Sequence, residues 1–178
     1  EMNEALGNKK NLASNLGNIG NVYNRQADYP KALDYYFRAL KMDEELGNKK
    51  SIASNLENIG NIYEKQADFS KALDYYFRAL EMNEGLGNKK SLASTLGNIG
   101  TLYTKTKKYK EAEEYLLKAL SIDKEIGAQD GERHKEESLS ELYENTDRHK
   151  DALEHYKKAM MLKDTLFSQD NKKQMVRK

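Results

Sequence analysis

The sequence contains no cysteine, a single proline and no long apolar run. Without cysteine, disulfides, thiolate metal sites and cysteine nucleophiles are all excluded. No apolar segment approaches the roughly 18 residues that a membrane-spanning helix requires, and no signal peptide is visible. Neither charge is in excess, because 30 basic residues stand against 29 acidic ones and the net charge is +1. This balance argues against bulk attraction to nucleic acid or to an anionic membrane surface.

Motifs for catalysis are also missing. The sequence has no glycine-rich phosphate loop, serine nucleophile elbow or zinc-hydrolase helix. Because 33% of the residues are charged, paired acids occur too often by chance to indicate acid–base catalysis. Asp151 and His155 have a spacing that can chelate a divalent ion, but no second pair of ligands accompanies them, although His134 and His149 lie nearby. We therefore expect a chain that is not an enzyme, binds no metal and needs no cofactor.

A forty-residue unit recurs through the chain. Residues 11–50 begin NLASNLGNIGNVY, residues 51–90 begin SIASNLENIGNIY, and residues 91–130 begin SLASTLGNIGTLY. The first two copies are identical at 29 of 40 positions. A degenerate fourth copy occupies residues 131–168. Such a fixed period indicates stacked supersecondary units that share one continuous core.

The two ends of the chain also match parts of the repeat. Residues 1–10 read EMNEALGNKK, which resembles KMDEELGNKK at residues 41–50. We therefore expect residues 1–10 to be the end of a preceding repeat, and the chain to be a piece of a longer array. Residues 169–178 are expected to begin a connector or a capping helix.

Each repeat is predicted to form two helices. In the first copy, Asn8 is a candidate N-cap for a helix over residues 9–26. Asp28 is expected to cap the second helix, with Pro30 in its first turn. That helix should end at Gly47, in the left-handed conformation that glycine adopts readily. The expected apolar face of the first helix consists of Leu12, Leu16, Ile19 and Tyr23.

The pattern L-x-x-I-G-x-x-Y followed by A-x-x-x-Y-x-x-A resembles the signature of the tetratricopeptide repeat. In the first copy it is carried by Leu16, Ile19, Gly20, Tyr23, Ala32, Tyr36 and Ala39. Leu116 replaces the second tyrosine in the third copy, and Glu136 replaces the first leucine in the fourth. The resemblance implies an all-α fold, an α-solenoid of antiparallel helix pairs in a right-handed superhelix. Tyr36 and its equivalents are expected to pack between repeats, with their hydroxyls reaching water.

The forty-residue period is longer than the usual tetratricopeptide unit. It is similar to that of kinesin light chain and, more closely, to that of bacterial sensor proteins. In those sensors, repeats reading YPKALDYYFRAL end in a segment like EHYKKAMMLKDTLFSQDNKK and lead to an output domain. This resemblance implies the sensory or scaffold part of a larger bacterial signalling protein. A cytoplasmic location is expected, and a periplasmic one stays open.

Polar residues recur at two positions of the first helices. In tetratricopeptide arrays these helices line the concave groove. In the family member that transfers N-acetylglucosamine to serine and threonine, an asparagine at the first position binds peptide backbone. A carboxamide suits this role because it offers both donors and an acceptor. Carried over by position, Asn18, Asn58 and Asn98 are predicted to bind peptide backbone. The second position lies one helical turn further on, and we predict that its residues Asn21, Asn61 and Thr101 also contact the peptide.

Two alternatives stay open at this point. The asparagines could instead bridge neighbouring first helices by hydrogen bonds, with no role in binding. The array could also be architectural and associate with itself through its repeat ends, or regulate a kinase, cyclase or DNA-binding domain on the same chain. A clamp for a partner's C-terminal carboxylate is not expected, because no basic residue occurs at the neighbouring groove positions Ser14, Gly17, Ser54, Glu57, Ser94 and Gly97.

Overall fold

The computed structural model describes the backbone of residues 2–176 and the side chains of residues 7–171 and 175. This part of the chain forms eight helices and no strand, which confirms the all-α class. The chain divides into two compact units, residues 1–87 and residues 88–178. The first unit contains α1 (Met2–Arg25), α2 (Tyr29–Glu45), α3 (Lys49–Lys65) and α4 (Phe69–Leu86). The second contains α5 (Lys89–Lys105), α6 (Tyr109–Glu125), α7 (Gln129–Glu144) and α8 (His149–Val176).

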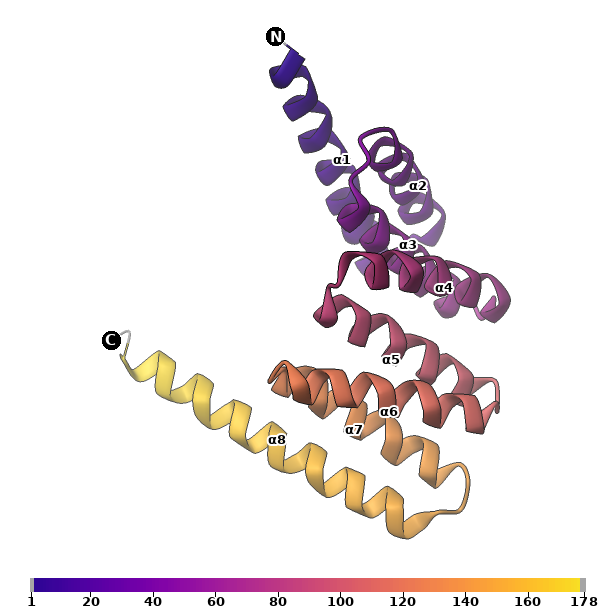
Figure 1. Cartoon of the computed structure of the whole chain (residues 1–178), viewed down its shortest axis with the longest axis vertical. Coiled ribbons are helices and arrows are strands. Elements are labelled where there is room, and N and C mark those ends of the chain that lie inside the picture. Colours follow the sequence, from indigo (N-terminus) through magenta and orange to yellow (C-terminus); the bar gives the residue numbers. More distant parts are fainter. Residues whose placement is uncertain (1, 177–178) are drawn as a thin grey trace. The chain divides into compact units, whose positions relative to one another are not determined.

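Within each unit, successive helices form antiparallel pairs (Figure 1). The pairs α1–α2, α3–α4, α5–α6 and α7–α8 pack most extensively. In addition, α2 contacts α3 in the first unit, and α6 contacts α7 in the second. This arrangement is the one expected for helical-hairpin repeats, since each hairpin covers the apolar face of its neighbour.

The predicted cap of the second helix in the first repeat is confirmed. Asp28 Oδ1 accepts a hydrogen bond of 3.2 Å from the backbone N–H of Lys31, and Asp68 does the same in the next repeat. Pro30 lies in the first turn of α2. Gly47 adopts a φ of +64°, as its position after the second helix predicts. Gly87 and Gly127 repeat this conformation.

The turns inside the hairpins also contain a left-handed residue, and this one is not glycine. Ala27 has a φ of +58° and Ala67 a φ of +59°. In each case the next N–H reaches back to the carbonyl of the fifth residue before it, as in the 3.0 Å bond from Asp28 N to Tyr23 O. This six-to-one bond is typical of a Schellman C-cap, which requires the left-handed conformation. The capping bonds therefore hold an alanine where glycine would be favoured.

The predicted start of the first helix is wrong. The helix α1 is continuous over Met2–Arg25, so Asn8 lies inside it and does not cap it. The same glycine–asparagine pair does separate α2 from α3, at residues 47 and 48. There, the packing of α3 against α2 requires the chain to reverse, whereas α1 runs straight through residues 7 and 8. The assignment of residues 1–10 to an earlier repeat stays a prediction, and Glu1 lies outside the described residues.

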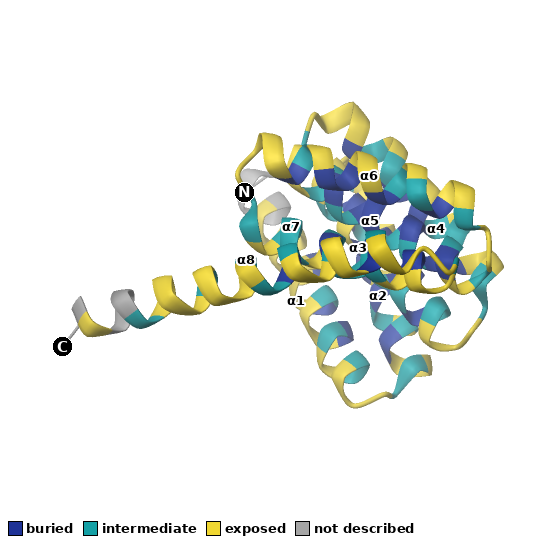
Figure 2. Cartoon of the chain, turned by 90° about the horizontal axis from the view of Figure 1, so that it is seen from below, coloured by how far each residue is buried: buried dark blue, intermediate teal, exposed yellow. Residues whose placement is uncertain are grey.

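Each unit has its own apolar core (Figure 2). In the first unit, the core lies between the helices of each hairpin and between α2 and α3, and includes Tyr36, Leu56 and Ile59. On α1 the predicted apolar face is only partly buried, because Leu16 is covered while Ile19 is 38% exposed. Its repeat equivalent Ile59 is 0% exposed. The core of the second unit contains Ala112, Leu116, Leu120, Leu139, Leu142, Tyr143 and Ala152.

The helix α8 continues well beyond the last hairpin. Its later part carries exposed apolar side chains, including Met161 and Phe167. The predicted connector over residues 169–178 is helical as far as Val176, and residues 177 and 178 lie outside the described part. Its role as a connector stays a prediction.

Candidate binding site on the first helices

At the second of the two asparagine positions, Asn21 on α1 and Asn61 on α3 each bind the hydroxyl of a buried tyrosine. The hydroxyl of Tyr36 donates to Asn21 Oδ1 at 2.7 Å. The hydroxyl of Tyr76 lies 2.6 Å from Asn61 Oδ1 and 2.7 Å from Glu64 Oε2. Both rings are fully buried, and burial raises the pKa of both phenols. The prediction that these hydroxyls reach water is therefore wrong, and the Oδ1 atoms of both asparagines are already engaged.

The first asparagine position is different. Asn18 is exposed, and Asn58 and Asn98 are half-buried. None of the three makes a hydrogen bond to another residue among the side chains that the structure describes, so their carboxamides are available to a ligand. Neighbouring first helices are bridged instead by two hydroxyls, since Thr101 Oγ1 on α5 lies 3.4 Å from Ser138 Oγ on α7.

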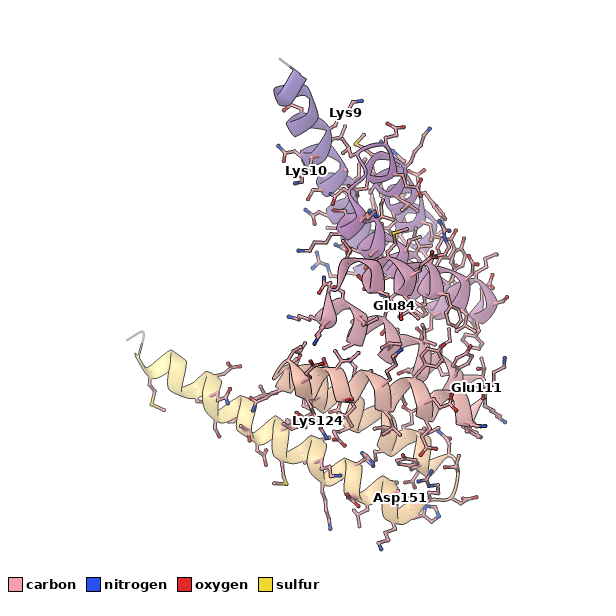
Figure 3. All side chains as sticks on the ribbon, viewed as in Figure 1. Lys9, Lys10, Glu84, Glu111, Lys124 and Asp151 are labelled. Atoms are coloured by element: carbon pink, nitrogen blue, oxygen red, sulfur yellow. The ribbon has the colours of Figure 1, made fainter. Side chains whose placement is uncertain are left out.

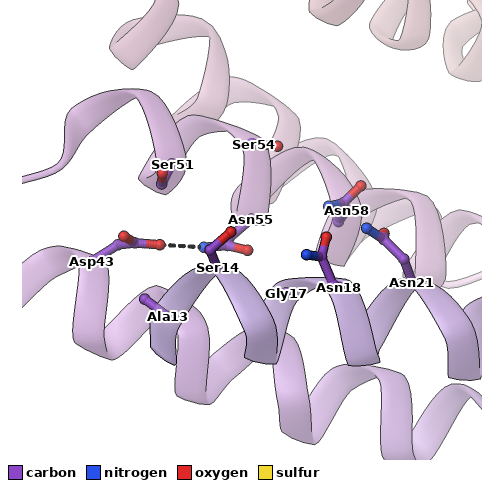
Figure 4. Close-up of a pocket in the computed structure, with 10 residues that line it drawn as sticks. All are labelled: Ala13, Ser14, Gly17, Asn18, Asn21, Asp43, Ser51, Ser54, Asn55 and Asn58. Atoms are coloured by element: carbon purple, nitrogen blue, oxygen red, sulfur yellow. Dashed lines mark hydrogen bonds between the residues drawn. The ribbon is translucent and has the colours of Figure 1, made fainter. Parts of the chain in front are cut away.

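A polar cavity of about 140 Å³ lies beside these asparagines in the first unit (Figure 4). Its volume is close to that of a cavity known to admit a benzene-sized molecule and well below that of a drug-sized pocket. One side chain of a peptide is therefore the size of group that it could accept. The cavity is lined by Ala13, Ser14, Gly17, Asn18, Asn21, Asp43, Ser51, Ser54, Asn55 and Asn58.

The far end of the cavity contains a buried carboxylate. Asp43 on α2 is only 3% exposed. Its Oδ2 accepts a hydrogen bond of 2.9 Å from Asn55 Nδ2, and its Oδ1 accepts one of 3.3 Å from Asn48 Nδ2. Burial raises the pKa of Asp43, while the two amide donors and the charge of Lys10 act in the opposite direction. Sequence analysis missed this residue, although an acid or its amide recurs there as Asn83 and Asp123.

In the second unit, the equivalent carboxylate has a cation of its own. Lys135 Nζ on α7 lies 3.2 Å from Asp123 Oδ2. The two side chains are 12% and 3% exposed. Lys135 occupies the repeat position of Asn55, eighty residues further along the chain. Sequence analysis considered basic residues only at the positions of Ser14 and Gly17 and their equivalents, whereas Lys135 stands at the position of Asn15, Asn55 and Thr95.

A second buried acid lies in the degenerate fourth repeat. Glu136 is 0% exposed, and its Oε2 lies 2.5 Å from His155 Nδ1. Its other oxygen, Oε1, accepts a hydrogen bond of 3.2 Å from Lys124 Nζ. Sequence analysis identified Glu136 as a departure from the leucine of the repeat, but it did not predict that His155 and Lys124 would contact this carboxylate. No group of three or more potential metal ligands occurs among the described residues.

Lysine pairs recur at residues 9–10, 49–50 and 89–90, and tyrosine pairs at residues 35–36 and 75–76. Lys9 and Lys10 project from α1 (Figure 3), and the equivalent pairs of the later repeats are exposed as well. Tyr35 stacks on Tyr23 with ring centroids 5.4 Å apart, within one repeat. Phe37 meets Tyr75 of the next repeat at 6.2 Å. These rings therefore pack both within and between repeats.

The charge of Asp43 should lower stability at neutral pH. Since burial raises the pKa of Asp43 above its unfolded value, ionisation costs stability as the pH rises through the folded pKa. We expect Asp43→Asn to raise the free energy of unfolding by about 0.5–1 kcal/mol at neutral pH. The gain should vanish at about pH 3, where the carboxyl is protonated in both states. Urea unfolding at the two pH values measures the difference.

Asp34 provides the matched control for that substitution, because it is exposed and pairs with Arg38 on the surface of α2. Asp34→Asn should change the free energy of unfolding by less than about 0.5 kcal/mol. A loss of stability in Asp43→Asn would contradict the prediction, and would mean that the carboxylate contributes more through its two amide bonds than its burial costs.

The family model for the tetratricopeptide repeat matches residues 11–85, 51–125 and 91–163, which together cover most of the sequence. The chain belongs to the tetratricopeptide repeat family. Tetratricopeptide solenoids present extended concave surfaces to their partners, so membership supports a protein-interaction module. No curated protein sequence matches the chain at a significant level.

Several solved tetratricopeptide-like structures are similar to the chain. BtubC (BKLC) from P. vanneervenii has a TM-score of 0.78 and 22% identity, over 87% of this chain and 64% of its own. The apo form of RapI has a TM-score of 0.80 and 20% identity, over 88% of this chain and 44% of its own. A Rap protein complexed with competence and sporulation factor has a TM-score of 0.80 and 22% identity, over 86% and 43%. The chain thus spans less than two thirds of each of these structures.

Within the part of the chain that the structure describes, no helix is both long and apolar enough to span a membrane.

Proposed function

We propose that this chain is a protein-interaction module whose first helices bind an extended peptide segment of a partner. The observation that carries the proposal is the set of carboxamides at Asn18, Asn58 and Asn98, which have no hydrogen-bond partner among the described side chains. In the first unit, Asn18 and Asn58 stand beside the open cavity of Figure 4. A carboxamide can pair with both the N–H and the C=O of a peptide backbone. A carboxamide can therefore bind an extended segment whatever the side chains of that segment are.

The roles of the other predicted residues follow from their bonds. Asn21 and Asn61 keep their Nδ2 donors for a ligand, because only their Oδ1 atoms are used by the tyrosines. Thr101 shares its hydroxyl with Ser138. We therefore assign peptide contact chiefly to the first asparagine position, and a supporting role to the second.

We also propose that the module belongs to a larger bacterial signalling protein, acts by binding rather than by catalysis, and works in the cytoplasm. The similar Rap protein complexed with competence and sporulation factor supports a role in recognising a signalling factor. The sensor-like sequence of residues 154–173 supports an output domain on the same parent protein.

Replacing Asn18 and Asn58 together by alanine tests the proposed role. Each lost hydrogen bond contributes about 0.5–1.5 kcal/mol net, and 1.4 kcal/mol corresponds to a tenfold change. We expect the double variant to bind peptides selected from a displayed random library about 10–100-fold more weakly than the original chain does. Its fold should be retained, because alanine is the better helix former. Fluorescence anisotropy with labelled peptides measures the affinities.

The matched control is the double replacement of Gln26 and Gln66 by alanine. These residues carry the same carboxamide group, are exposed, and lie at equivalent hairpin turns outside the cavity. Their replacement should leave the affinity unchanged. Equal affinities for the two double variants would mean that the peptide binds elsewhere, and would overturn the proposed site.

Self-association is the second candidate, and the apolar face of α1 favours it. Leu12 is 49% exposed and Val22 is 42% exposed, although the equivalent Ile52 and Ile62 are buried. A stable dimer in light scattering that Val22→Lys dissociates would favour this architectural role over peptide binding.

A further inference from the structure

The two buried carboxylates of the second helices are repeat equivalents with different partners. Asp43 and Asp123 occupy the same repeat position, and both are almost completely buried. On the next first helix, the residue that faces the carboxylate is Asn55 in one case and Lys135 in the other. The two sites therefore show the same acid with and without a cation.

In the second unit, the path of the lysine side chain is well defined. A Cβ atom added to Gly97 would lie 2.7 Å from Lys135 Cε and 3.3 Å from its Nζ. The aliphatic stem thus runs directly over the glycine, and the ammonium ends on Asp123. The absence of a side chain at residue 97 is what makes room for the lysine.

In the first unit, the same path is open. Gly17 occupies the repeat position of Gly97, and the nearest atom to a Cβ placed there is Asn55 Oδ1, at 3.5 Å. The cavity of about 140 Å³ takes up the space above it. Asp43 receives amide N–H donors at its two oxygens, and it forms no ion pair within the described part of the chain. The carboxylate of Asp43, the glycine at residue 17 and the open volume between them are thus arranged like the site in the second unit that Lys135 occupies.

We propose that the Asp43 cavity is a specificity subsite for a lysine side chain of the bound peptide. The stem of that side chain would lie over Gly17, and its ammonium would reach the carboxylate, as Lys135 does at Asp123. The subsite rests on the peptide-binding function proposed above, and it adds sequence preference to a contact that otherwise involves backbone alone. Asn18 and Asn58 line the same cavity, so one peptide can reach both groups.

The chemistry of the subsite favours lysine over arginine. An ammonium has three donors, and beside Asp43 it would meet Asn55 Oδ1 and the hydroxyls of Ser14 and Ser51 as further acceptors. A guanidinium prefers a carboxylate with two free oxygens for a bidentate contact. Both oxygens of Asp43 already accept an amide hydrogen bond. A compact point charge is therefore the better complement.

The first test uses only the protein and asks whether an ammonium fits the site. Asn55→Lys reproduces the residue found at position 135 of the second unit. We expect it to raise the Tm by about 2–4 °C. In an Asp43→Asn background the same replacement should not raise the Tm. A Tm effect that is the same in both backgrounds would overturn the subsite.

The second test uses short random peptides displayed on phage and selected on the whole chain. Selected peptides should share a lysine, and replacing that lysine by norleucine should weaken binding about 10–100-fold, as expected for a charged hydrogen bond. With Asp43→Asn or Asn55→Lys, the same replacement should change binding less than threefold. Replacing the peptide lysine by arginine should weaken binding at least fivefold. Lys10→Gln, which removes a nearby charge outside the cavity, should preserve the preference.

The outcomes separate the two proposals. Peptides that depend on Asn18 and Asn58 but show no lysine preference would overturn the subsite and leave the proposed function intact. A lysine preference that persists in Asp43→Asn would also overturn it. If no selected peptide depends on Asn18 and Asn58, the proposed function fails and the subsite fails with it.

Discussion

Gly60→Ala should lower the free energy of unfolding by about 2 kcal/mol, although alanine is the better helix former. A Cβ atom at residue 60 would lie 2.7 Å from two ring carbons of Tyr76. That ring cannot move aside easily, because it is 0% exposed and its hydroxyl is bonded to Asn61 and Glu64. Overpacking of this kind costs about 1–3 kcal/mol, which exceeds the gain in helix propensity of up to about 1 kcal/mol. Urea unfolding followed by circular dichroism measures the loss.

The same substitution should change sign when the ring is removed. In a Tyr76→Ala background, which itself costs about 3–5 kcal/mol, Gly60→Ala should stabilise the chain by up to about 1 kcal/mol. Gly85→Ala is the matched control in the same hairpin, because nothing lies within 4 Å of a Cβ placed there. It should be stabilising in both backgrounds. If Gly60→Ala were equally destabilising with and without the ring, the close approach of helix and tyrosine would not be the cause.

These contacts explain why the sequence predicts the hairpins so well. The glycine at residues 20, 60 and 100 recurs because each one lies against the same neighbour position, a tyrosine twice and Leu116 once. The repeat pattern therefore reflects one packing contact that occurs in several repeats, and the second-helix caps at Asp28 and Asp68 recur in the same way. Because the same contacts recur, the fold can be predicted from a single sequence.

The start of α1 could not be predicted in this way. Residues 7 and 8 have the same identities as Gly47 and Asn48, but the local sequence does not show whether another helix packs there and stabilises a turn. The continuous helix shows that the glycine permits the left-handed turn without imposing it. Tertiary packing, which the repeat motif only implies, decides whether the turn forms.

The candidate site was predictable in part. The sequence identified both asparagine positions, but it could not distinguish the available carboxamides from those that bind Tyr36 and Tyr76, because this depends on a hydroxyl fifteen residues away. The buried carboxylates were missed for a related reason. Asp43 and Asp123 look like ordinary surface acids in a highly charged helix, and only the packing of the next first helix buries them.

The buried acids described here thus fall into two groups, those paired with a cation and one that has only amide donors. Asp123 and Glu136 have cations supplied by the second unit itself. Asp43 has only amide donors among the described residues and opens into a cavity. A charge that is buried without a counter-ion lowers stability, and it is retained most readily where a ligand supplies the missing charge. The difference between the sites therefore supports the proposed subsite at Asp43 and a structural role for the other two carboxylates.

Glu136 provides the most demanding test of that structural role. His155→Phe keeps the ring next to Tyr143, whose centroid lies 5.1 Å from that of His155. The substitution removes the partner of Glu136 Oε2 and leaves only Lys124 Nζ, on a side chain that is 48% exposed. Breaking a buried pair in this way costs about 3–5 kcal/mol. We expect a loss of about 3 kcal/mol in the free energy of unfolding, because the lysine still provides some compensation.

Adding Glu136→Leu to His155→Phe, to give a double variant, should restore the lost stability. It restores the residue type found at Leu16, Leu56 and Leu96, the equivalent positions of the first three repeats. Replacing a buried ion pair by apolar residues of similar volume is neutral or stabilising by about 1–4 kcal/mol, so the double variant should be at least as stable as the original chain. The control is His149→Phe, which alters an exposed histidine on the same helix and should change stability by less than about 0.5 kcal/mol. If Glu136→Leu failed to recover the stability of His155→Phe, the loss would come from the packing of the histidine ring and not from an uncompensated buried carboxylate.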